Sequence, residues 1–196
     1  MRLVVAISGA SGAIYGIRAL QALKEAGVET HLVLTDAALQ TIRLETEYER
    51  SEVEGLATEV HRVDDITSRI ASGSFRTDGM LVIPCSMKTL AGIASGYSDN
   101  LLLRAADVTL KERRRLILVV REAPLSLIHI ENMATVTRAG AVVLPAMPAF
   151  YHAPKTVQEL VDQVVGKGLD LLGVEHRLYR RWGEAGKPKT SRRRPT

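Results

Sequence analysis

The chain has 196 residues and a mass of 21.4 kDa, with 46% hydrophobic and 24% charged residues, a composition typical of one globular domain with a sizeable core. Its single cysteine, Cys85, excludes an internal disulfide framework and favours a reducing compartment. No apolar stretch is long enough to span a bilayer, and the first apolar run is too short for a signal peptide. We therefore expect a cytoplasmic protein with no membrane association.

The formal net charge of +4 comes from the end of the chain. Residues 187–196 contain no acid and five basic side chains, and the remaining chain has 21 basic against 22 acidic residues. We therefore predict one domain over residues 1–185, followed by a basic, disordered tail over residues 186–196. A solvated tail is favoured over a nucleic-acid-binding segment because the basic residues are confined to it.

The first predicted elements enclose a glycine-rich loop. Residues 1–7 are typical of a buried strand and residues 13–26 of an amphipathic helix, with the loop Ser8-Gly9-Ala10-Ser11-Gly12 between them. A helix N-terminus directs free N–H groups and a positive dipole end into such a loop, which favours an anion. The loop lacks the G-x-G-x-x-G pattern of dinucleotide sites, so a mononucleotide or flavin phosphate fits better than NAD, although a plain structural turn remains possible.

Strands and helices alternate along the rest of the chain. Further strands are predicted at residues 28–34, 60–63, 80–84, 116–120 and 141–144, and helices end near residues 44, 94, 113 and 138. Thr156-Val157-Gln158-Glu159 resembles a capping box that opens a last helix, with inward positions at Val157, Leu160, Val161, Val164 and Val165. Residues 48–73 show little pattern beyond the short strand. The alternation predicts an α/β protein of three layers with a doubly wound, mostly parallel sheet.

Chemically capable side chains follow the predicted strand ends. In a parallel sheet these ends meet at one edge, where ligands bind. The residues concerned are Ser11, Thr35, Ser86, Met87, Lys88, Thr89, Arg121, Glu122 and Tyr151. Each has a simpler interpretation: Ser86 as a helix cap, and Arg121 with Glu122 as a surface ion pair. Cys85 is better explained as a small buried residue than as a nucleophile.

Two further features concern charge and assembly. Arg104 lies in a helix of leucines and alanines, which favours a paired anion beside it. The run Leu101-Leu102-Leu103 exceeds the apolar surface that one sheet needs, and this predicts burial between subunits. The five histidines lack metal-ligand spacing, so no metal site is predicted.

Several motifs together resemble one known family, the UbiX-type flavin prenyltransferases. The matching segments run from Met1 to about Glu184 and are Ser8–Gly12 with Tyr15-Gly16, Leu44-Glu45-Thr46, Pro84–Thr89, Arg104–Val108, Leu110–Arg114, Arg121–Pro124, Glu131-Asn132-Met133, Phe150-Tyr151-His152 and Arg181–Glu184. The combination around Arg121-Glu122-Ala123-Pro124 is highly specific. The resemblance implies a flavodoxin-like fold.

The resemblance also implies an activity. Members of the family join the dimethylallyl group of dimethylallyl phosphate to reduced FMN at N5 and C6, without a metal. The product, prenylated FMN, is the cofactor of UbiD-type decarboxylases. Members assemble as homododecamers with sites between subunits. The recipient decarboxylase is left open, with quinone biosynthesis and aromatic-acid breakdown both possible.

Site residues are carried over by position. The resemblance assigns FMN binding to Gly9, Ala10, Ser11, Thr35, Ser86, Met87, Lys88, Thr89 and Arg121. It assigns the surroundings of the prenyl phosphate to Arg104, Lys111, Glu122, Tyr151 and Lys167, and an aromatic face beside the prenyl group to Trp182. Ser11 and Glu45 would move protons near flavin N5, and Glu122 and Lys111 would assist departure of the phosphate.

The sequence departs from the family pattern at two positions. Lys167 replaces the usual arginine, which changes a bidentate phosphate clamp into a point charge. Thr35 replaces a common serine and keeps the hydroxyl.

Two other functions remain open from the sequence. One is a flavin-dependent cysteine decarboxylase of the same fold. That family uses a histidine early in the chain, whereas here the first histidine is His31, and Pro84–Thr89 occupies the place of its Pro-Ala-Ser-Ala-Asn-Thr motif. The other is a non-catalytic flavin-binding subunit of a decarboxylase.

Overall fold

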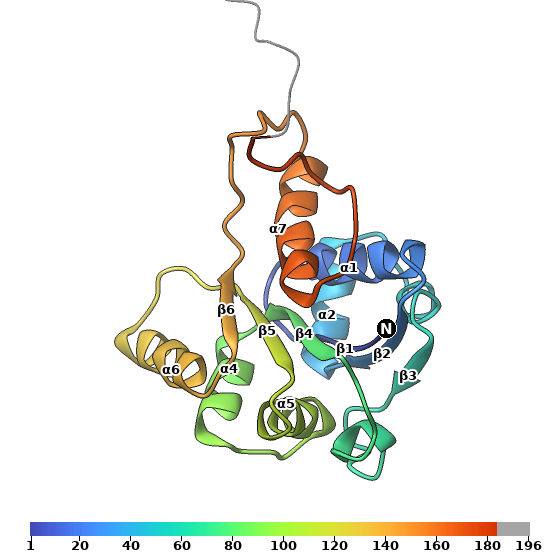
Figure 1. Cartoon of the computed structure of the whole chain (residues 1–196), viewed down its shortest axis with the longest axis vertical. Coiled ribbons are helices and arrows are strands. Elements are labelled where there is room, and N and C mark those ends of the chain that lie inside the picture. The colour runs from blue at the N-terminus through green and yellow to red at the C-terminus, as the bar shows by residue number, and fades with distance from the viewer. Residues whose placement is uncertain (184–196) are drawn as a thin grey trace, which may run out of the picture.

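The computed structural model describes residues 1–183, so the predicted tail and the end of the predicted domain lie outside the described residues. Six parallel strands form one sheet in the order β3-β2-β1-β4-β5-β6 (Figure 1). The strands are β1 (Arg2–Ile7), β2 (Glu29–Leu34), β3 (Glu59–His61), β4 (Gly79–Cys85), β5 (Arg115–Val120) and β6 (Val142–Pro145). The helices are α1 (Ala13–Glu25), α2 (Asp36–Glu45), α3 (Arg50–Glu54), α4 (Met87–Ser95), α5 (Leu101–Lys111), α6 (Leu127–Arg138) and α7 (Val157–Leu172).

The parallel register confirms the predicted fold class. Val5 of β1 pairs with Leu32 of β2 and with Leu81 of β4, and the order reverses direction beside β1, as a doubly wound sheet requires. Every residue of β4 is buried, because helices cover both faces of the sheet.

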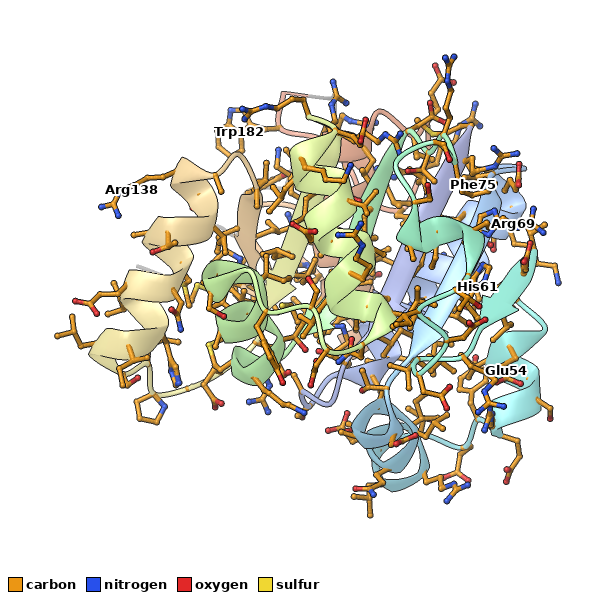
Figure 2. The ribbon with its side chains drawn as sticks, turned by 90° about the horizontal axis from the view of Figure 1, so that it is seen from below. Glu54, His61, Arg69, Phe75, Arg138 and Trp182 are labelled. Atoms are coloured by element: carbon orange, nitrogen blue, oxygen red, sulfur yellow. The ribbon has the colours of Figure 1, made fainter. Side chains whose placement is uncertain are left out.

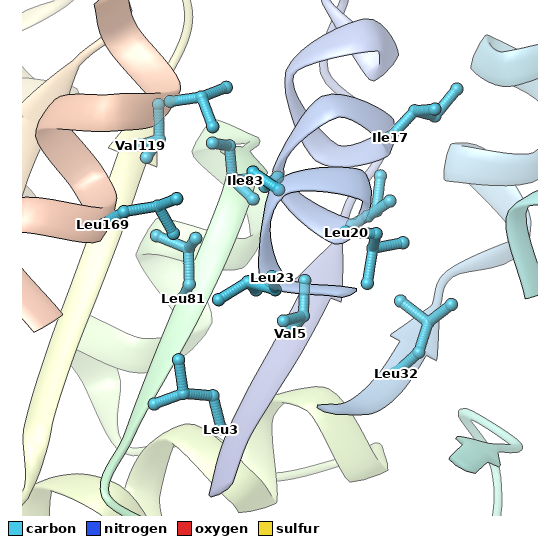
Figure 3. Close-up of a cluster of buried hydrophobic side chains, with 14 of the residues drawn as sticks. Leu3, Val5, Ile17, Leu20, Leu23, Leu32, Leu81, Ile83, Val119 and Leu169 are labelled. Atoms are coloured by element: carbon cyan, nitrogen blue, oxygen red, sulfur yellow. The ribbon is translucent and has the colours of Figure 1, made fainter. Parts of the chain in front are cut away.

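Two apolar cores lie on opposite faces of the sheet. On one face, side chains of β1, β2, β4 and β5 pack against α1 and α7, and Figure 3 shows Leu3, Val5 and Leu81 beside Leu23 and Leu169. On the other face the sheet packs against α4, α5 and α6. Leu101, Leu102 and Leu103 belong to this second core and are at most 6% exposed, so the prediction that they face another subunit is wrong.

The exposed apolar surface lies instead on α6 and the loops beside it. Leu127, Ile128 and Ile130 are 69%, 67% and 51% exposed, and Met147 and Phe150 are also exposed. A patch of this kind marks an interaction surface in a folded chain. We therefore expect α6, rather than α5, to be buried between subunits.

The chain after β6 leaves the sheet and returns as α7, forming an arm that projects beyond the domain (Figure 1). Thr156 caps α7 by accepting the N–H of Glu159, but the Glu159 carboxylate binds the N–H of Lys155, so the reciprocal half of the predicted capping box is not formed. Val157 is 76% exposed rather than inward, because it lies at the projecting end of α7.

Residues 48–73, where the sequence shows little pattern, contain three short elements. They are α3, a helix of five residues, the strand β3 and a 3-10 turn over Arg69–Ala71. In α3 only Val53 is buried, so no apolar period marks it. None of the described helices is long and apolar enough to cross a membrane.

Candidate active site at the carboxyl edge of the sheet

The loop after β1 is fixed to its neighbours on both sides. Gly12 has a φ of +98°, in the left-handed region, which side chains rarely adopt. A Cβ on Gly9 would lie 2.3 Å from that of Ala37 in α2, so only glycine permits this approach. The Ser8 hydroxyl donates to the Pro84 carbonyl at 2.9 Å and accepts the Ser86 N–H at 2.8 Å. The loops after β1 and β4 therefore form one rigid unit.

Glu45, the last residue of α2, binds the N-terminus of α1. Its Oε2 accepts the N–H groups of Gly12 at 2.7 Å and Ala13 at 3.1 Å. The sequence assigns these N–H groups to a phosphate. In the structure, however, the positive dipole end of α1 holds the Glu45 carboxylate of the same chain. The backbone of Gly9, Ala10 and Ser11, in the same loop, does not take part in these two hydrogen bonds with Glu45.

Glu45 is also linked to Ser11 and Arg121. Burial alone would raise the pKa of the Glu45 carboxyl, but hydrogen bonds from Ser11, Gly12 and Ala13 and the charge of Arg121 together lower that pKa below its usual value. Ser11 and Glu45 thus form a hydroxyl–carboxylate pair with a cation nearby. Such a pair is able to pass a proton to and from a bound molecule.

Arg121 is placed by the sheet. Its backbone N–H donates to the Cys85 carbonyl at 3.3 Å, which continues the β4–β5 pairing into the loops. Burial raises the pKa of the Tyr15 hydroxyl, and the nearby Arg121 charge partly opposes this shift. Tyr15 is therefore a neutral hydroxyl beside the site. Tyr15 belongs to the Tyr15-Gly16 motif, but the sequence alone indicates no role for it.

Two more helix N-termini face this edge. Ser86 caps α4, accepting the Thr89 N–H at 3.3 Å and donating to the Thr89 hydroxyl at 3.1 Å. Thr35 caps α2 by accepting the Ala38 N–H at 3.1 Å. Both hydroxyls have the simple capping role, and the N–H groups of the first residues of each helix, Met87 and Lys88 in α4, have no intrahelical acceptor. The positive ends of α2 and α4 create a potential at this edge that suits a phosphate, whereas the positive end of α1 is occupied by the Glu45 carboxylate.

A pocket of about 260 Å³ lies beside Arg121, lined mainly by apolar residues. Its walls come from the loops after β5 and β6 and from α6, and they are Val120, Arg121, Glu122, Ala123, Leu125, Met133, Pro145, Ala146 and Met147. Glu122 is exposed and accepts the N–H of Ala123 at 3.0 Å. Within residues 1–183 it forms no ion pair with Arg121, which removes the surface-pair interpretation.

Within residues 1–183, Arg104 and Lys111 form no hydrogen bond or ion pair with Arg121. Helix α5 runs antiparallel to the strands and ends at the amino edge of the sheet, where Lys111 pairs with Glu112 at 2.5 Å. Arg104 donates to the Ala71 carbonyl and pairs with Asp107 at 2.7 Å. The anion predicted beside Arg104 is therefore Asp107. Lys111 is kept away from Arg121 because α5 leads into β5 and must end at the opposite edge of the sheet.

The remaining candidates lie on the arm. Tyr151 and Trp182 contact each other edge to face, with ring centroids 5.2 Å apart, and Trp182 is 81% exposed. Lys167 is exposed on α7. In the part of the chain that the structure describes, no hydrogen bond or ion pair connects these three residues to Arg121. They present an aromatic surface and a charge outward from the protomer.

Cys85 is structural, as the sequence predicts. It is fully buried in the second core, and burial raises the pKa of its thiol to about 12.

Comparison with known proteins identifies the family. Residues 1–169 match the family described as Flavoprotein. The flavin prenyltransferase UbiX of Thauera aromatica is 54% identical over 182 residues, which is 93% of this chain and 94% of that protein.

Solved structures agree. AnUbiX (PadA1), crystallised with FMN and dimethylallyl pyrophosphate, superposes with a TM-score of 0.92 at 53% identity, covering 94% of this chain and 98% of that chain. A dodecameric FMN-dependent UbiX-like decarboxylase from Escherichia coli O157:H7 gives 0.91 at 55% identity, covering 93% and 99%. The FMN-dependent cysteine decarboxylase TvaF, at 19% identity and a TM-score of 0.61, shares the fold alone. The chain therefore belongs to the UbiX family of flavin prenyltransferases.

Proposed function

We propose that this chain transfers the dimethylallyl group of dimethylallyl phosphate to N5 and C6 of reduced FMN, and that the product serves a UbiD-type decarboxylase. The observation that carries this proposal is the Ser11–Glu45 pair, which lies beside Arg121 at the same edge as an apolar pocket containing a carboxyl group. A proton carrier, a cation and an apolar wall are what an alkyl transfer to a flavin nitrogen requires.

Binding of FMN is assigned to the rigid loops. The N-termini of α2 and α4 offer free N–H groups and positive dipole ends for the phosphate, and Lys88 and Arg121 add charge. Reduced FMN supplies the nucleophilic N5 and C6 atoms. Because Ser8 locks the loops after β1 and β4 together, Gly9, Ala10 and Ser11 keep a fixed distance from Ser86 and Thr89.

Proton transfer is assigned to Ser11 and Glu45. The hydrogen bonds that lower the pKa of Glu45 keep it ionised at neutral pH, so it is able to accept a proton through the Ser11 hydroxyl. The N–H groups of Gly12 and Ala13 hold the carboxylate in place for this step. Glu45 is then able to return the proton.

Departure of the phosphate is assigned to Glu122 and to cations. The bond between the allylic carbon and the phosphate oxygen breaks, and the electron pair leaves with the phosphate. Glu122 lines the pocket beside Arg121 and is placed to donate a proton to this leaving group. The apolar part of the pocket suits the five-carbon chain.

The site is completed by neighbouring subunits. Arg104, Lys111, Tyr151, Lys167 and Trp182 do not reach Arg121 in one chain, and α6 exposes an apolar patch beside the pocket. We infer a homododecamer in which other subunits supply these side chains. The assembly works in the cytoplasm on small molecules, without nucleic acid, a membrane or a metal in the reaction.

A direct experiment mixes the protein with reduced FMN and dimethylallyl phosphate under anaerobic conditions and measures the mass of the extracted flavin. The expected product is FMN heavier by one dimethylallyl group, and it should activate a UbiD-type apo-decarboxylase. FMN that binds but keeps its mass would support a non-catalytic flavin-binding subunit. Release of carbon dioxide from a cysteine peptide would support the decarboxylase alternative.

A further inference from the structure

A second cluster of chemically capable side chains lies outside the active site, on β2 and β3. Both strands begin with the same pattern, Glu29-Thr30-His31 and Glu59-Val60-His61. Residues two apart on a strand point to the same face, so each glutamate lies on the face of its histidine. The parallel register sets His31 beside Glu59 and Val33 beside His61, which brings the two patterns together. The wide separation of the two histidines in the sequence hides this pair.

The ring nitrogens of the two histidines face each other. His31 Nδ1 lies 2.8 Å from His61 Nε2, and the rings are stacked with centroids 5.1 Å apart. The Glu59 carboxylate faces both nitrogens, with one oxygen 3.7 Å from His31 Nδ1 and the other 3.7 Å from His61 Nε2. His31 is 1% exposed and His61 is 8% exposed. Two imidazoles and one carboxylate therefore converge on one point at the edge of the core.

The outward nitrogens of both rings are held by oxygen atoms. His31 Nε2 lies 3.1 Å from Glu29 Oε1, and His61 Nδ1 lies 2.8 Å from the Ser68 hydroxyl. These contacts allow each outer nitrogen to carry a proton. Once the proton shared between the two inner nitrogens is lost, His31 Nδ1 and His61 Nε2 are both lone-pair donors. Metal-bound histidines are oriented in this way, by an oxygen acceptor behind the ring.

Two arginines border the cluster. Arg69 approaches one Glu59 oxygen at 3.1 Å, and Arg2 binds Glu29 at 2.7 Å. Both guanidinium groups lie over the Phe75 ring, which also contacts the His31 ring edge to face. The second oxygen of Glu59, the one nearer His61, remains available as a ligand. The cluster is accessible to solvent at Glu59, because the side chain of Glu59 is 35% exposed.

We propose that His31, His61 and Glu59 form a binding site for one divalent transition-metal ion, with zinc as the best match. Two imidazoles and a carboxylate with a fourth position for water are a common zinc ligand set. Nitrogens about 2.0 Å from a tetrahedral zinc lie about 3.3 Å apart, so the rings need to separate by only about 0.5 Å. The ion replaces the proton shared between the two rings, and that proton leaves to solvent.

The site serves the fold rather than the reaction. β3 is the short edge strand of the sheet, and it carries two of the three ligands. Figure 2 shows His61, Arg69 and Phe75 at the β3 side of the molecule, with Trp182 and Arg138 at the opposite side. A bound ion would fasten β3 to β2 and stabilise the chain against unfolding, without contact with the loops at Ser11 and Arg121.

The test uses the full chain after dialysis against a chelator. Co²⁺ is added as a spectroscopic probe, and the binding of Zn²⁺ is measured by calorimetry. We expect one ion per chain, visible absorption bands typical of four-coordinate Co²⁺, displacement of Co²⁺ by Zn²⁺, and a higher midpoint of thermal unfolding with Zn²⁺. None of these measurements depends on FMN or on turnover.

Variants separate this site from surface binding. Glu59→Gln and His61→Gln should each weaken Zn²⁺ binding at least about 10-fold, and Glu29→Gln should weaken it about 10–100-fold by releasing the His31 ring. Glu54→Gln is the matched control, because Glu54 lies on the neighbouring α3 and pairs with Arg50. Its affinity should stay unchanged.

Since His61 is buried, the Zn²⁺ affinity of its variant is interpreted only if the circular dichroism spectrum is unchanged. If that spectrum changes, the variant of the more exposed Glu59 decides the test. Absence of the cobalt bands, or equal Zn²⁺ affinity in the original chain and Glu59→Gln, would overturn the proposal.

Discussion

The carboxyl edge of the sheet and the outer end of α5 carry residues of the same proposed site, but they are built differently. At the carboxyl edge, Ser11, Glu45 and Arg121 come from three elements and interact within one chain. At the end of α5, at the opposite edge of the sheet, the ion-pair partner of Lys111 among residues 1–183 is its neighbour Glu112. In the proposed site, one chain would form the flavin-binding half, and assembly would bring in the half that binds the prenyl phosphate.

The largest effect is expected at the carboxyl edge, from Glu122→Gln. This change keeps size and hydrogen bonding but removes the transferable proton. We expect the rate of prenyl transfer to fall by about 10²–10⁴-fold while FMN affinity stays nearly constant. Single-turnover kinetics and FMN titration measure the two quantities. A variant with the original rate would leave Glu122 as a wall of the pocket and no more.

Lys111→Met tests the other half of the comparison. Losing one charge-assisted contact to a phosphate should reduce kcat/KM for dimethylallyl phosphate by about 10–100-fold, without change in FMN affinity. The matched control is Lys24→Met, since Lys24 lies in the last turn of α1 and binds the Gly55 carbonyl.

Coexpression of Lys111→Met with Arg121→Ala extends this test. If Lys111 acts on a neighbouring subunit, mixed oligomers contain some sites with both original residues, and activity returns. If Lys111 acts within its own chain, every site lacks one of the two residues. Mixed oligomers without activity would therefore contradict a shared site.

The sequence predicts the strand ends and helix caps at the carboxyl edge of the sheet well, because these features depend on residues that are close together in the chain. Strand ends and helix caps at Thr35 and Ser86 follow from residues adjacent in the chain, and the parallel sheet then brings them to one edge. The partners of Arg104 and Lys111 depend on which edge a helix end occupies, which the sequence pattern of that helix does not contain. Likewise the His31–His61 pair depends on the register of β2 and β3.

Glu45→Gln should affect stability as well as turnover. The Glu45 carboxylate binds the positive end of α1, and since Glu45 is exposed, solvent screening limits the contribution to about 1 kcal/mol of unfolding free energy. Its pKa is lower in the folded chain than in the unfolded one. The stabilisation is therefore complete above about pH 4.3 and is lost as pH falls through the lower folded value.

Denaturation of the original chain and Glu45→Gln at neutral and acid pH measures this difference. The gap between the two unfolding free energies should be largest at neutral pH and should shrink below about pH 4. Glu47→Gln, two residues further on, is the control, and it should show no such change. A gap that persists in acid would mean that the carboxylate charge is not what holds the loop.

The smallest effect is expected from Lys167→Arg. This change introduces the planar guanidinium of the arginine that the family pattern implies at this position. Lys167 is exposed on α7, so an arginine fits there without disturbing the core. A guanidinium binds two phosphate oxygens at once, whereas an ammonium acts as a point charge. If Lys167 reaches the phosphate of a substrate bound mainly to another subunit, the KM for dimethylallyl phosphate should fall by roughly two- to tenfold, with little change in kcat. Lys155→Arg, on the same arm, should leave KM unchanged. An unaltered KM in Lys167→Arg would remove this residue from the phosphate site and restrict the assembled half to Arg104, Lys111, Tyr151 and Trp182.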